Sequence, residues 1–127
     1  MRFGYTILYV RDVEGAVSFY ERAFGQRRRF VHESGYGELD TGGTRLGFAS
    51  LELARSNGVN FADPWSDAPA PAVEVAFLTD DVAAAVERAV AEGAVLVTPP
   101  KLKPWGQTVA YVRDLDGFLV ELCTPVD

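Results

Sequence analysis

The chain has 127 residues, of which 48% are hydrophobic, and a formal net charge of −6. This length suits one domain or two small half-domains that share a core, and such a chain buries about two-thirds of its unfolded surface. The acidic balance argues against nucleic acid as a partner, because binding to phosphates needs a basic surface. The longest apolar runs fall far short of the roughly 18 residues of a membrane span, so we expect no membrane insertion.

The start of the chain and its cysteine content bear on the cellular compartment. Residues 1–5 (MRFGY) lack a long apolar stretch and lead straight into a strand pattern, so we expect no signal peptide. Cys123 is the only cysteine in the sequence, so no disulfide can form within the chain. A reducing compartment, the cytoplasm, is therefore the predicted location.

The segments that begin at Tyr5 and at Glu74 follow the same plan. Each reads as a strand that leads into a helix with an aspartate at its start, and Asp12 aligns with Asp81 at a constant offset. Apolar residues recur at helical spacing after each aspartate, and a glycine follows as a typical helix stop. The sequence therefore predicts two copies of one supersecondary unit, with Tyr5 and Glu74 in equivalent places.

Three further strands are predicted after each helix, because short runs with strand periodicity alternate there with turn residues. In the first half we expect these strands at 30–33, 36–40 and 44–50. In the second half we expect them at 94–98, 107–113 and 118–124, with an extended connector at 99–104. Each half therefore has the order β-α-β-β-β.

The pattern divides the chain into a first module at 1–52, a connecting loop or flap at 53–72 and a second module at 73–127. Residues 51–72 are expected to be irregular, and a loop this long in a compact domain is usually a lid, a binding loop or a linker. Phe61 and Trp65 lie in it, and a pure linker seldom needs two large aromatic side chains. The segment is therefore either a plain connection or a flap that covers a site or a partner subunit, and these interpretations stay open.

Side chains alternate between the two faces of a strand, so the apolar set of each strand identifies the face that packs on a helix. In the last strand this argument turns Glu121 away from the helix, and in the strand at 74–79 it turns Glu74 the same way. The same face is expected to hold Tyr5, Ile7, Tyr9, Arg45, Gly47, Ala49 and Cys123. Two carboxylates are therefore predicted on one sheet face, opposite the helices.

An unpaired carboxylate within an apolar strand costs several kcal/mol if it is buried. In one interpretation Glu74 and Glu121 lie near solvent or pair with Arg45. In the other they line a wet cavity and contact a ligand. The residues alone leave both interpretations open.

Two stretches resemble the vicinal-oxygen-chelate superfamily, which includes glyoxalase I, bleomycin-resistance proteins, fosfomycin-resistance proteins and extradiol dioxygenases. The first stretch is Val10-Arg11-Asp12 followed by residues 19–25 (FYERAFG), similar to the first helix of that family. The second is residues 112–122 (VRDLDGFLVEL), similar to its closing hairpin, with Leu115 where the family often has proline. The resemblance covers nearly the whole chain. It implies an α+β fold in which two βαβββ modules form a U-shaped cup with the helices on the convex face.

The resemblance also bears on metal binding, because each module of the family's metal enzymes supplies two ligands from its first and last strands. By position these places are Tyr5, Gly47, Glu74 and Glu121. Glu121 matches the usual carboxylate, whereas Tyr5 and Gly47 depart from the pattern, and the only histidine, His32, lies away from all four places. Zinc, nickel and iron sites need imidazole or several carboxylates. We therefore expect no metal cofactor, with weak binding of a divalent ion by Glu74 and Glu121 as the alternative.

The first functional hypothesis is a protein like the bleomycin-resistance group, which binds a small planar or amphipathic organic molecule in its cup and forms a homodimer. Glu74 and Glu121 would attract a cationic group of this molecule. The expected ligand contacts are Tyr5, Tyr9, Arg45, Trp65, Trp105 and Gln107.

The alternative hypothesis is an enzyme of the same fold, of the lyase, isomerase or dioxygenase type. Without metal, Glu121 or Glu74 would act as general base, since two neighbouring carboxylates hold a proton more tightly than one. Tyr5 would donate a hydrogen bond to the substrate. A form that depends on a divalent metal would use the same two glutamates, and the missing histidines oppose it.

Overall fold

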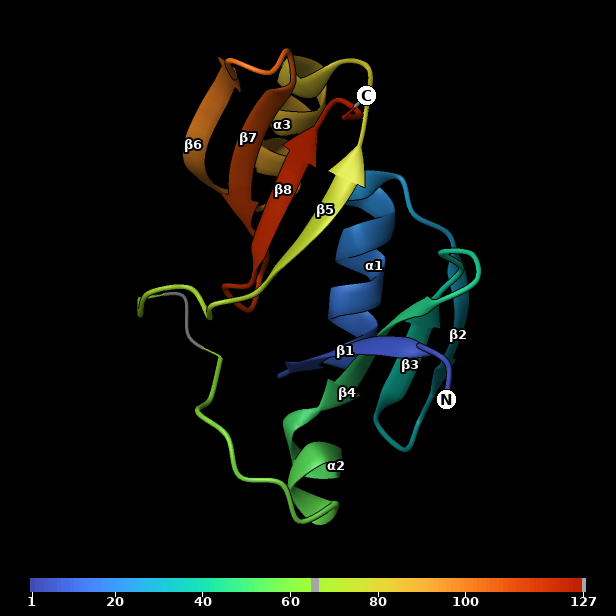
Figure 1. Ribbon diagram of the computed structural model, residues 1–127. Coiled ribbons are helices and arrows are strands. Elements are labelled where there is room, and N and C mark those ends of the chain that lie inside the picture. Colours follow the sequence, from blue (N-terminus) through green and yellow to red (C-terminus); the bar gives the residue numbers. More distant parts are fainter. Residues whose placement is uncertain (65–66, 127) are drawn as a thin grey trace. The chain divides into compact units, whose positions relative to one another are not determined.

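The computed structural model describes residues 1–64 and 67–126 of the chain. It divides into two compact units, the first from Met1 to Pro64 and the second covering the rest (Figure 1). Each unit holds a four-stranded sheet and a helix of ten residues or more. The predicted α+β class with two βαβββ modules is therefore confirmed, and the boundary between the units lies within the predicted connection at 53–72. The joining of the modules into one cup stays a prediction.

The sheet of the first unit has the strand order β1-β4-β3-β2. The strands are β1 (Tyr5–Val10), β2 (Arg28–His32), β3 (Tyr36–Leu39) and β4 (Arg45–Ser50). β1 runs parallel to β4, whereas β3 pairs antiparallel with both β2 and β4. Helix α1 (Val13–Phe24) connects β1 to β2 and packs against β2, β3 and β4.

Helix α1 begins and ends where the sequence predicts. The side chain of Asp12 accepts a hydrogen bond from the backbone of Gly15 at 3.1 Å, which caps the helix start. Gly25 ends the helix with a φ of 65°, a left-handed conformation that glycine adopts without strain. The buried face of the helix includes Tyr20, whose ring meets that of Phe48 on β4 at a centroid distance of 4.9 Å. This contact fixes the helix on one face of the sheet and leaves the opposite face for the polar residues.

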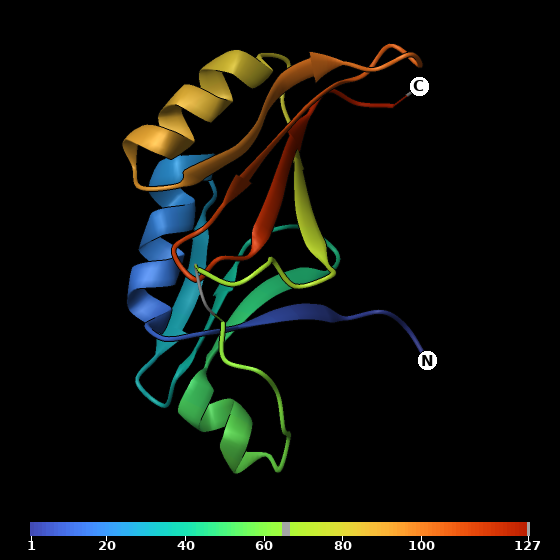
Figure 2. The same cartoon turned by 90° about the vertical axis from the view of Figure 1, so that its left-hand side faces the viewer.

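The second unit repeats this plan with the strand order β5-β8-β7-β6. Its elements are β5 (Glu74–Leu78), α3 (Val82–Ala91), β6 (Val95–Leu102), β7 (Thr108–Arg113) and β8 (Leu119–Cys123). Helix α3 lies along one face of this sheet against β6, β7 and β8 (Figure 2). The parallel pair β1–β4 starts at Tyr5 opposite Arg45, and the parallel pair β5–β8 starts at Glu74 opposite Leu119. Tyr5 and Glu74 are therefore equivalent in strand register, as the sequence repeat predicts.

The expectation of an irregular segment throughout 51–72 is wrong at its start, where residues Leu51–Ser56 form helix α2. Ser50 caps this helix by accepting a hydrogen bond from the backbone of Leu53 at 3.0 Å. Six residues are too few to show helical periodicity in the sequence, so the cap was the only available signal.

The expectation of a strand that stops at Thr98 is also wrong, because β6 continues to Leu102 through Pro99 and Pro100. Proline is tolerated in a strand at a sheet edge or at a bulge, where no partner needs its missing N–H. β6 is the edge strand, and its register against β7 shifts on both sides of Thr98. In the described part of the chain, none of the helices is long and apolar enough to span a membrane.

Candidate functional site

Glu74 on β5 and Glu121 on β8 lie on the same face of the second sheet. The parallel register places Ala76 opposite Glu121 and Leu119 opposite Glu74, so the two glutamates are diagonal neighbours. Long side chains in this relation reach each other. The register agrees with the predicted placement of both carboxylates, and their role in binding or catalysis stays a prediction.

Tyr111 on β7 is a partner of Glu121 that sequence analysis missed. It stands directly opposite Glu121 in the antiparallel pair β7–β8, and its hydroxyl donates a hydrogen bond to Oε1 of Glu121 at 2.7 Å. This hydrogen bond, with burial and the negative charge nearby, raises the pKa of Tyr111 well above its usual range. The phenol therefore stays protonated and its O–H remains directed at Glu121. The closing hairpin at 112–122 was the signal that could have revealed this pair, because its register sets Tyr111 against Glu121.

The protonation of Glu74 depends on its neighbour Glu121. Partial burial of its carboxyl, the charge of Glu121 and hydrogen bonding to Glu121 raise the pKa of Glu74, in that order. The side chain as a whole remains exposed, so solvent or a ligand reaches it. The carboxyl of Glu74 therefore holds a proton more readily than an isolated carboxyl group does.

Cys123 lies beside this pair on β8 but is not a nucleophile. The side chain is only 2% exposed, and its Sγ lies 3.9 Å from the carbonyl oxygen of Phe77. Burial and the neighbouring Glu121 raise the pKa of Cys123 to about 11. The thiol is therefore protonated at neutral pH, whereas a nucleophilic cysteine requires the thiolate.

Two predicted ligand contacts, Trp105 and Gln107, lie where β6 turns into β7. The side-chain amide of Gln107 donates to the carbonyl of Thr124 at 2.9 Å and accepts from Nε1 of Trp105 at 2.9 Å. Both polar ends of Gln107 therefore already have partners that fasten this turn to the end of β8. The ring of Trp105 is 64% exposed, which leaves it available for stacking. Ligand contact by either residue stays a prediction.

The predicted contacts of the first unit lie on the sheet face away from α1. Tyr5 and Ile7 are exposed on β1 while Leu8 and Val10 are buried, which agrees with the predicted alternation. Arg45 stands opposite Tyr5 in the β1–β4 register. Tyr9 is only half-buried, and its ring packs on Phe61 at a centroid distance of 4.8 Å. The predicted contact Trp65 lies outside the described residues, and roles in binding stay predictions for Tyr5, Tyr9 and Arg45.

A second tyrosine–glutamate pair, which sequence analysis also missed, lies on this face of the first sheet. The hydroxyl of Tyr36 donates to Oε2 of Glu38 at 2.8 Å, and Arg29 forms an ion pair with Oε1 of Glu38 at 3.1 Å. Glu38 is only 4% exposed. Burial and the hydrogen bond to Glu38 raise the pKa of Tyr36 well above its usual range. The phenol of Tyr36 therefore keeps its proton and donates it to Glu38. This hydrogen bond and the ion pair with Arg29 together offset the free-energy cost of burying the Glu38 carboxylate.

Tyr36 also closes the space next to Gly47. A Cβ at position 47 would lie 2.5 Å from the Tyr36 hydroxyl oxygen, far closer than non-bonded atoms approach. Gly47 stands opposite Glu38 on β3, as Glu121 stands opposite Tyr111 on β7. The place in the first unit that corresponds to Glu121 is therefore filled by the hydroxyl of Tyr36.

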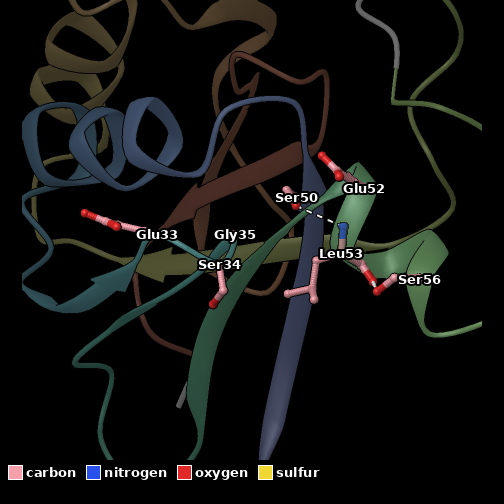
Figure 3. Close-up of a pocket in the computed structure, with 7 residues that line it drawn as sticks. All are labelled: Glu33, Ser34, Gly35, Ser50, Glu52, Leu53 and Ser56. Carbon is pink, nitrogen blue, oxygen red and sulfur yellow. Dashed lines mark hydrogen bonds between the residues drawn. The ribbon is translucent and has the colours of Figure 1, made fainter.

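A cavity of about 460 Å³ lies elsewhere in the first unit, between the β2–β3 turn and helix α2 (Figure 3). Its lining residues are Glu33, Ser34, Gly35, Ser50, Glu52, Leu53 and Ser56. The hydroxyl of Ser50 caps α2, and that of Ser56 donates to the carbonyl of Leu53 at 2.6 Å. Both hydroxyls therefore serve the helix. A second cavity of about 480 Å³ shares residues with the first and includes His32, whose side chain is exposed as expected.

The sequence of residues 2–122 matches the family model of the Glyoxalase/Bleomycin resistance protein/Dioxygenase superfamily. The chain belongs to this superfamily. This membership agrees with the resemblance noted in the first helix and the closing hairpin, and with the repeated βαβββ plan of the two units.

Superfamily members with names or solved structures are similar to the chain over almost its whole length. It is 31% identical over 126 residues to a putative lactoylglutathione lyase of Brassica oleracea var. gemmifera and 30% identical to a lactoylglutathione lyase of Arabidopsis thaliana. These matches cover 95% of the chain but 43% of each relative, so it spans less than half the length of these curated relatives. A glyoxalase-related enzyme of Fulvimarina pelagi has the same fold, with a TM-score of 0.83 and 24% identity over 98% of the chain and 88% of that structure.

The residues at the four superfamily ligand places do not fit a tightly held transition metal. Tyr5 offers only a phenol oxygen, Gly47 has no side chain and no room for one, and Glu121 already accepts a hydrogen bond from Tyr111. Two carboxylates alone lack the imidazole or thiolate donors that zinc, nickel and iron favour. Within residues 1–64 and 67–126, no group of three or more histidine, cysteine, aspartate or glutamate side chains is placed to hold a metal ion.

Proposed function

We propose that the protein binds a small planar or amphipathic organic molecule, and that Glu74 and Glu121 receive a cationic or hydrogen-bond-donating group of this molecule. The observation that carries the proposal is the 2.7 Å hydrogen bond from Tyr111 to Glu121. This bond directs the only proton of the tyrosine hydroxyl at Glu121. The phenol oxygen of Tyr111 and the remaining oxygens of both glutamates are then hydrogen-bond acceptors.

The charge balance at this face supports a cationic ligand. Within the described part of the second unit, neither Glu74 nor Glu121 forms an ion pair with a lysine or arginine side chain. Burial, followed by the charge of Glu121, raises the pKa of Glu74, which is consistent with two like charges close together. A bound cation would relieve the repulsion between the two carboxylates. A ligand with an amine, amidine or pyridinium group therefore suits this face better than an anion.

Stacking would supply the remaining affinity. The exposed ring of Trp105 lies on the turn that Gln107 fastens to the end of β8. Aromatic and cation–π contacts with such a ring contribute about 0.5–2 kcal/mol each. Binding of this kind needs no metal, which agrees with the poor donor set at the four superfamily ligand places.

Isothermal titration with ethidium, a planar aromatic cation, tests the proposal against phenanthridine, a related ring system without the permanent charge. We expect Glu121→Gln and Glu74→Gln each to weaken ethidium binding about tenfold and to change phenanthridine binding much less. Glu87→Gln is the matched control, because Glu87 is an exposed glutamate of α3 in the same unit. Equal binding by all three variants, or no binding of ethidium at all, would contradict the proposal.

A second candidate function is acid–base catalysis, which two observations favour. The curated relatives are named lactoylglutathione lyases, and burial with the neighbouring charge of Glu121 raises the pKa of Glu74. In such a step Glu121 would accept a proton from the substrate and Glu74 would return one, with Tyr111 holding Glu121 in position. The adduct of an α-ketoaldehyde with a thiol is the substrate class to test. Lost turnover with intact binding in Glu121→Gln would favour this function over simple binding.

The role of metal is tested separately, by elemental analysis of protein purified without chelators and by turnover measured with added Zn²⁺, Ni²⁺ or Mg²⁺. We expect substoichiometric metal and no metal-dependent turnover. One tightly bound transition metal per chain would overturn the metal-free proposal and support a metal-dependent lyase, isomerase or dioxygenase.

The homodimer is also part of the proposal. Edge strand β6 exposes Val95, Val97 and Leu102, which are 59%, 50% and 69% exposed. An apolar edge strand of this kind is usually covered or paired in the functional protein. Sedimentation velocity should give a mass of two chains. A monomer at micromolar concentration would contradict this part of the proposal without affecting the ligand.

A further inference from the structure

Residues 57–64 of the first unit form a strap that follows helix α2. The described residues of the strap form neither helix nor strand. Only its first two residues, Asn57 and Gly58, donate backbone hydrogen bonds, and both bonds return to α2. In the described chain, residues 59–64 have no backbone hydrogen bond to another segment. The strap is therefore held in place by its side chains.

Phe61 of the strap contacts both an aromatic ring and a cation. Its ring packs on Tyr9 of β1 at a centroid distance of 4.8 Å, with the two planes tilted by 55°. The guanidinium carbon of Arg55 lies 4.7 Å from the centroid of the Phe61 ring. Arg55, which belongs to α2, also forms an ion pair with Asp63. The strap thus places a benzene ring against Tyr9 and Arg55, and a carboxylate on the same arginine. We call the place that Phe61 occupies against these two residues the slot.

The slot lies on the face of the first sheet that points away from α1. Tyr9 belongs to the set of β1 side chains that point away from α1, together with Tyr5 and Ile7. An aromatic ring and a guanidinium that face the same space suit a planar ring with a negative charge at its edge. Phe61 and Asp63, two residues apart, supply these two groups from the chain itself.

We propose that Tyr9 and Arg55 form a binding slot for a small aromatic carboxylate, which the strap fills with its own Phe61 and Asp63 until the ligand displaces them. The ligand ring would take the place of Phe61 on Tyr9, and its carboxylate would take the place of Asp63 on Arg55. This site differs from the proposed function in position, since it lies wholly within the first unit. It also differs in charge, since it selects an anion.

The contacts that hold the strap are of a kind that a ligand can replace. Arg55 and Asp63 are 48% and 59% exposed, and exposed ion pairs are weak. Gly58 at the start of the strap has a φ of 81°, so the chain turns there in a conformation that glycine adopts freely. A ligand that competes with an internal occupant binds with an apparent affinity equal to its intrinsic affinity multiplied by the fraction of molecules in which the slot is free. Removing the occupant should therefore strengthen binding.

Titration of the full chain with benzoate, followed by the NMR signals of the Tyr9 ring, tests this inference. We expect Phe61→Ala to bind benzoate about tenfold to a hundredfold more tightly than the unaltered chain, because the slot is then free. Asp63→Asn should strengthen binding about threefold to tenfold, since it releases Arg55. Val59→Ala, a substitution within the strap but outside the slot, is the control and should leave the affinity unchanged.

Two further comparisons identify the groups that bind. Adding Tyr9→Ala or Arg55→Gln to the Phe61→Ala variant should abolish the gained affinity. Benzyl alcohol and cyclohexanecarboxylate, which each lack one of the two groups, should bind at least tenfold more weakly than benzoate. If Phe61→Ala proves unfolded by circular dichroism, Asp63→Asn decides the matter, because it keeps Phe61 in place. The inference is wrong if neither variant binds benzoate more tightly than the unaltered chain, or if benzyl alcohol binds as well as benzoate.

Discussion

Replacement of Gly47 by alanine tests whether the Tyr36 hydroxyl fills the space beside that glycine. The new methyl group would stand 2.5 Å from the hydroxyl oxygen and 3.0 Å from Cζ of Tyr36, so the tyrosine ring must move. That movement breaks the 2.8 Å hydrogen bond to Glu38, whose carboxylate is 4% exposed. Gly47 is not among the glycines with positive φ, so the alanine backbone itself is unstrained. The clash, with the hydrogen bond that it breaks, is therefore the source of the cost.

The size of the effect follows from these contacts. Forcing extra volume into a packed site costs about 1–3 kcal/mol, and replacing glycine by alanine returns about 0.4–1 kcal/mol through the unfolded chain. Gly47→Ala should therefore lower the free energy of unfolding by about 1–2 kcal/mol. Tyr36→Phe removes a hydrogen bond to a buried charge and should cost about 1.5–3 kcal/mol. In the double variant the hydroxyl is already absent, so the alanine should cost less than about 0.5 kcal/mol.

Urea unfolding followed by circular dichroism measures all three variants and yields the coupling between the two positions. Gly43→Ala is the matched control, because nothing lies within 4 Å of a Cβ at that position, and it should be neutral or slightly stabilising. The sum of the costs of the two single substitutions should exceed the cost of the double variant by about 1 kcal/mol. If the costs add to within about 0.5 kcal/mol, the Tyr36 hydroxyl does not occupy the space beside Gly47 and the structural argument fails.

Three further predictions concern titration and helix capping. The pKa of Glu74 is raised in the folded protein, so its contribution to stability is complete below pH ~4.3 and is lost as the pH rises through the raised value. The urea midpoint should therefore fall over this pH range, and it should fall less in Glu121→Gln, which lacks the neighbouring charge, than in the control Glu87→Gln. With a pKa of about 11 and 2% exposure, Cys123 should react with a disulfide reagent at pH 8 at least a hundredfold more slowly in folded than in urea-unfolded protein, and equal rates would contradict its placement. Ser50→Ala removes the cap of α2 and should cost about 1 kcal/mol in thermal unfolding, whereas the exposed Ser34→Ala should cost nothing measurable.

The elements of the fold were predictable because local pattern determines them. The aspartate caps and glycine stops located α1, and the constant offset between Tyr5 and Glu74 was enough to reveal the second copy. Strand alternation also placed Glu74 and Glu121 on one face, because a period of two needs no knowledge of the partner strand. Local pattern failed at α2, which is too short to show a period, and at the prolines of β6, which only an edge strand tolerates.

The partners of the carboxylates were not predictable in the same way, because they depend on register between strands. Tyr111 meets Glu121 only because β7 and β8 align at that pair, and Tyr36 reaches over Gly47 only because β3 stands opposite β4. Sequence analysis treated Gly47 as a missing ligand. The structure shows instead that the glycine makes room for a side chain from the neighbouring strand.

The two tyrosine–glutamate pairs differ in how the charge of their glutamate is balanced. In the second unit the glutamate comes from the last strand and the tyrosine from the strand before it, whereas in the first unit Glu38 occupies the register place of Tyr111. This exchange buries Glu38 and pairs it with Arg29, so its charge is already balanced. Glu121 keeps a partly exposed carboxylate beside a second one, and the neutral phenol of Tyr111 donates a hydrogen bond to it. The repeat is symmetric in its backbone but asymmetric in charge: among the described residues, the buried glutamate of the first unit has an arginine partner, whereas neither glutamate of the pair in the second unit has one.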